Sequence, residues 1–256
     1  MRKGAVVRRA LLVETGIAAV ALAARRRPAA GAALLGAGAL LAWGAFARNS
    51  PLYGRVMHHG PDGDARFALT FDDGPGPSTA AVLDALRDQD ARATFFVLGR
   101  QVEAHPDLVR RMVDEGHEIA NHGYDHGILV FRGARHVADQ IARTEAAVEE
   151  AVGPGVIAPL FRAPHGFRGP LSAAGVRRAG YRAAGWTVGV FDSDQPGAGV
   201  IADRATRALS PGTILLLHDA DGWDPAASRD QTAEAIAPIC AAARERGLQP
   251  VPLGAL

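Results

Sequence analysis

Two adjacent aspartates, Asp72 and Asp73, follow a run of strand-forming residues in ALTFDDGP, residues 68–75. Two like charges side by side repel each other, and Asp-Gly alone is enough to make a turn. A solvated turn is therefore the simple interpretation. The alternative is a site in which each carboxylate has its own chemical role. The residues at the ends of the other expected strands decide between the two.

Four further segments place ionisable residues directly after runs of strand-forming residues, namely NHGYDHG, FRAPHG, VFDSD and LLLHD. They supply His122, His126, Arg162, His165, Asp192, Asp194, His218 and Asp219. The carboxyl ends of parallel strands meet at one edge of a sheet, where α/β proteins place their chemistry. Solvated turns alone do not account for five such strand ends, so we expect a functional site at this edge.

The two histidines His122 and His126 are four residues apart, a spacing that lets both imidazoles face one ion. A histidine pair alone is more often structural. Two imidazoles with one carboxylate, however, form a three-ligand set that leaves positions open for water. One of Asp72 and Asp73 would then bind the metal while its neighbour accepts the water proton. Neighbouring side chains of an extended segment point in different directions, so we expect only one to be a ligand.

Short β-rich runs alternate with helix-like segments from residue 65 onward. We expect strands at 67–71, 93–98, 118–120, 158–161, 182–188 and 213–217, and a closing strand within 248–256. We expect helices near 78–89, 106–115, 137–152, 170–179 and 232–246. This alternation predicts parallel strands with crossover helices. Six or seven units are few for an eight-fold barrel, so a deformed (β/α) barrel with fewer than eight regular strands is the first choice. A doubly wound open sheet is the second.

The composition is that of a folded protein, with 48% hydrophobic and 21% charged residues in 256. The formal net charge of +1 is unevenly spread, because residues 1–50 carry eight Arg or Lys against the single acid Glu14. The rest of the chain is mildly acidic without a basic stripe, which argues against a nucleic-acid partner. The one cysteine, Cys240, excludes an internal disulfide and a cysteine-based zinc cluster. We expect Cys240 to be a small buried apolar residue of a helix.

The N-terminal segment 28–47 has 20 residues without a charge, about the length that crosses a bilayer. The cluster 25–27 is Arg-Arg-Arg, and the positive-inside rule predicts that it stays in the cytoplasm with the body of the protein outside. The shorter apolar stretch 10–24 is a candidate for an additional span. The sequence Ala-Phe-Ala at 45–47 resembles a signal-peptidase site, which would give a secreted protein instead. A buried helix of a soluble domain fits less well, because no face is polar.

These segments resemble the polysaccharide deacetylase family, the NodB-homology domain of carbohydrate esterase family four. TFDDGP matches the first motif of that family unchanged, and LLLHD matches the last. HGYDH matches H-[ST]-x-x-H except for Gly123, and RAPHG matches R-x-P-x-G with His165 at a position that is usually aromatic. The fourth motif, D-x-x-D-W, keeps only Asp192. The resemblance covers 65–256, so we expect 1–50 to be a basic N-terminus with an anchor or signal, 51–64 a lead-in, and 65–256 the catalytic domain.

The resemblance implies a role for each motif residue. It implies a catalytic base at Asp72, metal ligation by Asp73, His122 and His126, an arginine that holds the base at Arg162, and a general acid at His218 that Asp192 orients. It also implies that Leu216 lines the pocket for the acetyl methyl group and that the backbone N–H of His165 contacts the oxyanion. Trp223 and Tyr124 are candidate substrate contacts, with loop packing as the alternative for each. The missing Trp of the fourth motif bears on sugar contacts rather than on the reaction.

The function that these residues predict is metal-dependent removal of N-acetyl groups from N-acetylglucosamine-containing polysaccharide outside the cytoplasmic membrane. The glycan would be peptidoglycan, a chitin-like oligomer or an exported polysaccharide. Zn²⁺ suits two histidines and one carboxylate best, and Co²⁺ or Ni²⁺ would take the same ligands. The alternatives are an O-acetyl esterase, a non-haem iron oxygenase, and a glycan-binding wall protein with a decayed site. A spare base and acid at Asp72 and His218 favour hydrolysis. Nothing in the sequence indicates an oligomeric state.

Overall fold

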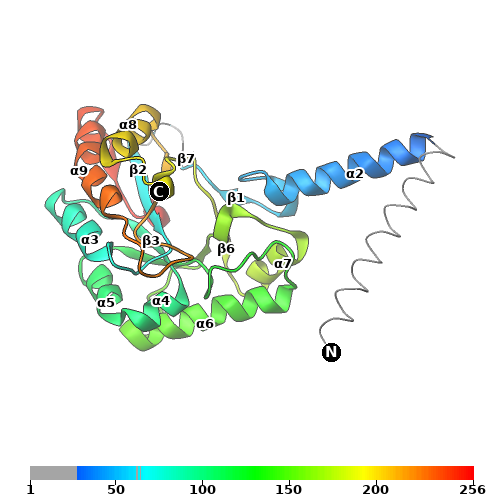
Figure 1. Ribbon diagram of the computed structural model, residues 1–256, viewed down its shortest axis with the longest axis horizontal. Helices are drawn as coiled ribbons and strands as arrows, with labels where there is room; N and C mark the ends of the chain where they lie inside the picture. The colour runs from blue at the N-terminus through cyan, green and yellow to red at the C-terminus, as the bar shows by residue number, and fades with distance from the viewer. Residues whose placement is uncertain (1–27, 62, 64) are drawn as a thin grey trace.

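The computed structural model describes residues 28–61, 63 and 65–256. The basic N-terminus, with the arginine cluster 25–27 and the candidate span 10–24, lies outside these residues, so the structure does not test the predictions made for it. Within them, the chain forms one parallel sheet with helices on its outer side and one long apolar helix before it (Figure 1).

The sheet has nine strands, and every strand pair is parallel. They are β1 (Val56–Met57), β2 (Arg66–Asp72), β3 (Thr94–Val97), β4 (Glu118–Asn121), β5 (Leu160–Phe161), β6 (Arg182–Ala184), β7 (Val188–Gly189), β8 (Ile214–His218) and β9 (Gln249–Pro250). Their order in space is β1-β6-β5-β4-β3-β2-β8-β7, and β9 also pairs with β2. Only four of these strands are four or more residues long, so the sheet is irregular. The deformed (β/α) barrel expected from the sequence is confirmed.

The connection between β6 and β7 makes the sheet curl. The sequence predicts one strand over 182–188, but the structure has two strands separated by only three residues, 185–187. These two strands lie near opposite ends of the strand order. On one side Gly185 N donates to Met57 O at 2.7 Å, and on the other Thr187 N donates to Ile214 O at 2.9 Å. So short a link between distant strands requires the sheet to close toward a barrel.

Seven helices follow the strands and cover the outer face of the sheet (Figure 1). They are α3 (Thr79–Asp88), α4 (Gly99–Ala104), α5 (Pro106–Asp114), α6 (Ala134–Val152), α7 (Pro170–Arg178), α8 (Ala198–Ala208) and α9 (Asp230–Glu245). The sequence analysis missed α4, which is short, and α8. The buried stripe of α8 is Ile201, Ala202 and Ala205, and a stripe made mainly of alanine gives a weak hydrophobic periodicity.

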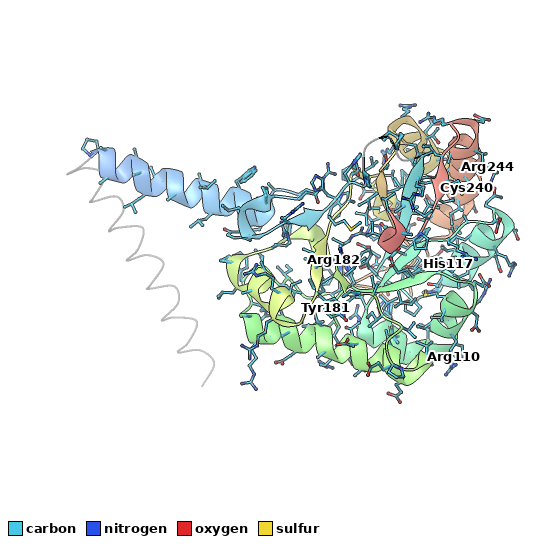
Figure 2. All side chains as sticks on the ribbon, turned by 180° about the vertical axis from the view of Figure 1, so that it is seen from behind. Arg110, His117, Tyr181, Arg182, Cys240 and Arg244 are labelled. Atoms are coloured by element: carbon cyan, nitrogen blue, oxygen red, sulfur yellow. The ribbon has the colours of Figure 1, made fainter. Side chains whose placement is uncertain are left out.

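Two apolar clusters lie on the two faces of the sheet. Phe67, Leu69 and Phe71 of β2 point to the helix layer, in the largest cluster. Ala68 points to the barrel interior, as the two-residue period of a strand requires. Cys240 lies buried on α9 (Figure 2), where burial raises the pKa of its thiol to about 11. This placement fits the expected role of a small core residue.

The apolar helix α2 (Pro28–Phe46) projects away from the barrel (Figure 1). Its leucines and Trp43 are largely exposed, and its 19 residues rise about 28 Å, close to the thickness of a bilayer core. The helix therefore has the length and composition of a membrane span or a signal sequence. Its last turn contacts the body, where Arg168 N donates to Ala45 O at 3.1 Å and the Phe46 and Phe167 rings meet edge-on at 5.2 Å.

Candidate active site

A cleft of about 430 Å³ opens where β2, β4 and β8 end. In the register of the sheet, Asp72 at the end of β2 is the partner of His218 at the end of β8. The cleft is lined by Asp72, Asp73, His122, His126, Ala163, His165, Gly166, Trp186, Ser193, Leu216, His218, Asp221, Gly222, Trp223 and Arg229. The strand ends that the sequence analysis singled out therefore meet at one place.

The turn after β2 brings both aspartates into this cleft. Asp72 is the last strand residue, and Asp73 has a φ of 77°, in the left-handed region that aspartate tolerates better than most residues. Nε2 of His122 lies 3.3 Å from Oδ1 of Asp73 and 3.8 Å from Oδ2 of Asp72. The chain leaves the strand conformation at Asp73, and of the two carboxylates only that of Asp73 joins the cluster of donor atoms formed with the two histidines.

Asp73, His122 and His126 form a buried three-donor set whose ligand atoms all lie within 4.8 Å of one another. The two histidines come from the loop after β4. His122 places Nδ1 2.9 Å from Arg162 O, which assigns the proton to Nδ1 and leaves Nε2 free to ligate. His126 Nε2 lies 3.1 Å from Asp73 Oδ1. The predicted ligands are therefore brought together in space.

The Asp73 carboxylate has the character of a metal ligand. Oδ2 accepts a hydrogen bond from Gly222 N at 3.0 Å, whereas buried Oδ1 has no hydrogen-bond donor among the described residues. Burial alone would raise the pKa of Asp73, but His122 and His126 outweigh it and hold that pKa well below its usual range. An ionised oxygen that faces two imidazole nitrogens fits a divalent cation with open coordination positions.

Arg162 holds the other carboxylate in place. This arginine is fully buried, and its Nη1 donates to Asp72 Oδ1 at 2.6 Å and to Thr70 Oγ1 at 2.8 Å. Its Nη2 donates to Gly185 O at 2.7 Å, and its guanidinium lies over the ring of Phe96. A charge-assisted bond of this kind fixes the direction of a carboxylate, so the free Oδ2 of Asp72 faces the cleft beside His122.

His218 is paired with a buried carboxylate. Its Nδ1 lies 2.9 Å from Asp192 Oδ1, and its backbone N–H donates to Asp192 Oδ2 at 2.7 Å. Thr232 Oγ1 donates to the same Oδ2 at 2.9 Å. Burial would lower the pKa of His218, but Asp192, with smaller contributions from Asp73 and Asp72, raises it to about 10. These carboxylates favour the protonated imidazolium of His218, the form that a proton donor requires.

Aromatic side chains form one wall of the cleft. His165 has a φ of 60° within the turn Pro164–Gly166. Its ring stacks on that of Trp223, with 5.3 Å between the ring centres and 20° between the planes. Trp223 is 65% exposed and so offers a face to a ligand, and Leu216 lies within the same cleft. Tyr124 does not line the cleft, because its hydroxyl donates to Glu103 and its ring lies under Arg143.

Known proteins with similar sequences place the chain in a family. It is 38% identical over 213 residues to a chitooligosaccharide deacetylase of Bradyrhizobium sp. (strain ANU 289), and the match covers 79% of this chain and 96% of that protein. The chain belongs to the polysaccharide deacetylase family. The family model for polysaccharide deacetylase matches residues 59–184.

Solved structures of this family share the fold. The Bc1960 peptidoglycan N-acetylglucosamine deacetylase is 28% identical, with a TM-score of 0.71 over 77% of this chain and 90% of that chain. A mutant of BA3943, a family 4 pseudoenzyme with restored activity, is 26% identical, with a TM-score of 0.69 over 78% and 70% of the two chains. The family therefore includes members that have lost activity.

Two large side chains of the cleft, Trp186 and Arg229, were not predicted from the sequence. Trp186 lies between β6 and β7, in a segment that the sequence analysis assigned to one strand. It packs against Gly166, where a Cβ would come within 2.6 Å of the indole and where φ is 72°. Arg229 pairs with Asp221 and donates to Ala220 O at 3.2 Å. Splitting the strand at Gly185 would have revealed Trp186, whereas no spacing in the sequence indicates Arg229.

Proposed function

We propose that this family member is a metal-dependent hydrolase that removes N-acetyl groups from N-acetylglucosamine-containing polysaccharide outside the cytoplasmic membrane. The observation that carries the proposal is the cluster of Asp73, His122 and His126, with Asp72 and His218 on the neighbouring strand ends. A structural metal site would need no free base and acid beside it. A set of three donors with open positions is typical of catalytic sites.

Asp73, His122 and His126 would hold the metal, most simply Zn²⁺, with Co²⁺ or Ni²⁺ as alternatives. When bound, such an ion supplies a more acidic water and polarises a carbonyl oxygen. Asp72 accepts the proton of the attacking water through the oxygen that faces the cleft. Arg162 keeps that carboxylate correctly turned, because it bonds the other oxygen.

His218 donates a proton to the nitrogen of the scissile amide, since an amine leaves poorly unless it is protonated. Asp192 holds the imidazole by its Nδ1, so Nε2 is the atom that gives the proton. The backbone N–H of His165 would stabilise the oxyanion. The C–N bond breaks as a C–O bond forms, which yields acetate and a glucosamine unit. Leu216 would contact the acetyl methyl group, and Trp223 would stack on a sugar ring.

Two observations support the proposed place of action, namely the helix α2 and the relatives. The relatives named above act on chitooligosaccharide and on peptidoglycan. An apolar helix directly before the body suits an anchor that holds the catalytic domain, 65–256, outside the membrane, with 51–64 as the lead-in. Cleavage after Ala47 would give a secreted enzyme with the same site.

Two other functions remain as alternatives. An O-acetyl esterase would use the same residues on an ester, whose alkoxide leaves with less help from His218. The second alternative is a family member that binds glycan but has lost its catalytic activity, since BA3943 is a pseudoenzyme of this family. The decayed site is disfavoured here, since each chemical role in the proposed reaction has a residue in position.

The test is the release of acetate by the metal-loaded full chain from N-acetylglucosamine oligomers and from O-acetylated xylan, with free amines measured in parallel. We expect acetate and amines in equal amounts from the oligomers, loss of both with a chelator, and recovery with Zn²⁺. Acetate from the xylan alone would establish the esterase. If chelator-stripped and metal-loaded protein both failed on both substrates and on peptidoglycan, while glycan binding persisted, the catalytic proposal would be overturned.

A further inference from the structure

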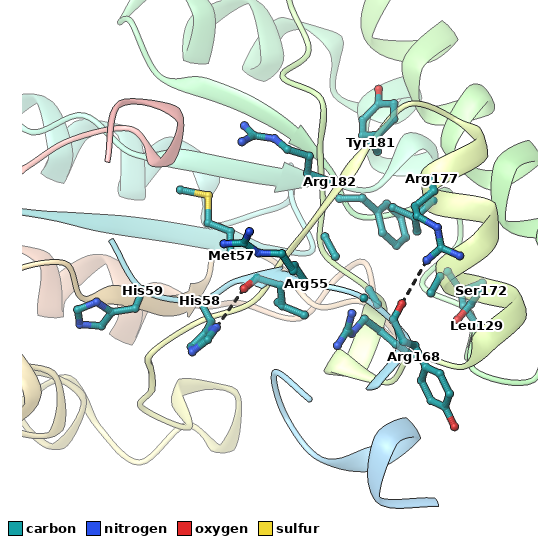
Figure 3. Close-up of a pocket in the computed structure, with 18 of the residues that line it drawn as sticks. Arg55, Met57, His58, His59, Leu129, Arg168, Ser172, Arg177, Tyr181 and Arg182 are labelled. Carbon is teal, nitrogen blue, oxygen red and sulfur yellow. Dashed lines mark hydrogen bonds between the residues drawn. The ribbon is translucent and has the colours of Figure 1, made fainter. Parts of the chain in front are cut away.

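A second groove, larger than the cleft of the candidate active site, meets that cleft at Ala163, which lines both. It has a volume of about 850 Å³ and runs between β1, the end of β5 and α7 (Figure 3). Its floor is apolar and includes Met57, Leu129, Phe161 and Val176. A volume of this size is at the upper end of the range for small-molecule sites. The proposed deacetylase reaction uses none of these side chains.

The rim of this groove is cationic. Arg55, Arg168, Arg177 and Arg182 all line it. Among the residues that the structure describes, no aspartate or glutamate lines the groove, and none forms an ion pair with these four arginines. Arginines gathered without a carboxylate partner are complementary to an anion with several oxygens, such as a phosphate.

Among the four arginines, Arg168 gives the strongest indication of an anion site, because only 9% of its surface is exposed. Its Nη2 donates to Ser50 O, whereas a guanidinium carries five N–H donors. Burial lowers the pKa of Arg168, and no carboxylate opposes that effect. A buried cation without a counter-charge is costly. An anion in the groove would remove that cost.

The groove lies at the base of α2. Arg177 Nη1 donates to Tyr53 O at 3.2 Å, in the segment that follows α2 (Figure 3). Large apolar side chains are exposed at this base, where Trp43, Phe46 and Phe131 are each about half exposed or more. The Phe46 and Phe131 rings meet at 6.2 Å. Aromatic residues at the end of an apolar helix mark the membrane–water boundary.

We propose that this groove binds an anionic phospholipid of the membrane in which α2 is anchored, with the phosphate among Arg55, Arg168 and Arg177 and an acyl chain along the apolar floor. The arginine rim is complementary to the phosphate, and the apolar floor is complementary to the acyl chain. The position beside α2 brings the rim and the floor within reach of the bilayer surface. The inference rests on the proposed membrane anchor and not on the deacetylase chemistry.

The test uses the full chain in a neutral detergent and measures binding of dioctanoylphosphatidylglycerol, dioctanoylphosphatidylcholine and inorganic phosphate. We expect saturable binding of the glycerol lipid, and binding at least about tenfold weaker for the other two probes. Arg177→Gln and Arg55→Gln should each weaken binding of the glycerol lipid about tenfold, since each removes one charge-assisted contact. Arg178→Gln is the matched control, because Arg178 is exposed on the same helix and does not line the groove.

Arg168→Gln should abolish binding, but it alters a buried residue, so the exposed Arg177 and Arg55 variants carry the conclusion. Unchanged unfolding temperatures would show that these two variants fold. Equal affinity for both lipids would overturn the proposal. An equal loss of lipid affinity in Arg177→Gln and in Arg178→Gln would also overturn it. Tight binding of inorganic phosphate would overturn the lipid proposal, because the ligand of the groove would then be a free anion. If alkaline carbonate released the protein from neutral vesicles, α2 would not be a membrane anchor, and the lipid proposal would be refuted. This outcome is independent of the acetate assays that test the deacetylase proposal.

Discussion

At the scale of single residues, the pairing of His218 with Asp192 sets the pH range of the proposed acid step. Asp192 raises the pKa of His218, with smaller contributions from Asp73 and Asp72 that a bound cation would partly offset. Removing the Asp192 charge must lower that pKa. His218 would then lose its proton at a lower pH, and the basic limb of the activity profile would move with it.

Asp192→Asn should therefore lower kcat by about 10²-fold and shift the basic limb of the kcat–pH profile to lower pH, because the imidazolium loses its partner. Asp194→Asn is the matched control, since Asp194 is exposed two residues away and does not line the cleft. A profile with the same basic limb in Asp192→Asn and in the wild type would contradict the role of His218 as the acid.

At the scale of elements, the turn after β2 depends on a contact from α3. Thr79 Oγ1 accepts a hydrogen bond from Gly76 N at 2.8 Å and donates to Asp219 Oδ2 at 2.6 Å. Gly74 lies so close to Asp219 that a Cβ would come within 2.1 Å of its carboxylate. The turn that carries Asp72 and Asp73 is thus held between α3 and the end of β8.

Thr79→Val keeps the shape of the side chain but leaves Gly76 N and Asp219 without their partner. We expect it to lower the free energy of unfolding by about 1–3 kcal/mol, measured by denaturant titration, and to reduce kcat while the metal is retained. Thr206→Val on α8 is the control, because no side-chain hydrogen bond of Thr206 is present in the described part of the chain. If the two variants lost equal stability, the turn would not depend on this contact.

The same elements show what could be predicted from the sequence. The parallel strands β2, β3, β4 and β8 were predicted because short runs of strand-forming residues alternate with helix-like segments, and family motifs located Asp72, His122 and His218. The split of β6 from β7 leaves no periodic pattern, because only three residues link the two strands, and Gly185 is the residue that could have indicated it. The left-handed conformation of Asp73 depends on the turn and its contacts rather than on local propensity. Arg229 reaches the cleft through tertiary contacts alone.

At the scale of the whole molecule, a buried neutral histidine links stability to pH. His117 lies buried directly before β4 (labelled in Figure 2), where Ala93 N donates to its Nδ1 at 3.2 Å and the Phe95 ring packs against it. Burial, only partly opposed by Glu115, lowers the pKa of His117 to about 4. The folded state therefore binds fewer protons than the unfolded state between pH 6.5 and 4. His117 contributes stability above pH 6.5 that is lost as the pH falls toward 4.

We expect this linkage to remove about 3 kcal/mol of unfolding free energy between pH 6.5 and 4. His117→Asn should flatten that dependence, because an amide oxygen can accept the Ala93 bond without titrating. His136→Asn, at an exposed position of α6, should leave the dependence unchanged. Denaturant titrations at several pH values, with chelator present to keep the metal site out of the measurement, give the result. Parallel curves for all three proteins would contradict this assignment.

The two adjacent carboxylates Asp72 and Asp73 are proposed to have different roles, and one paired measurement distinguishes these roles. Bound Zn²⁺ and acetate release from N-acetylglucosamine oligomers would be determined on the same samples of wild type, Asp72→Asn and Asp73→Asn. We predict that Asp72→Asn keeps one metal and loses about 10³-fold in kcat, whereas Asp73→Asn loses both metal and activity. An Asp72→Asn protein that releases acetate at the wild-type rate, or an Asp73→Asn protein that binds Zn²⁺ as tightly as the wild type, would contradict the account.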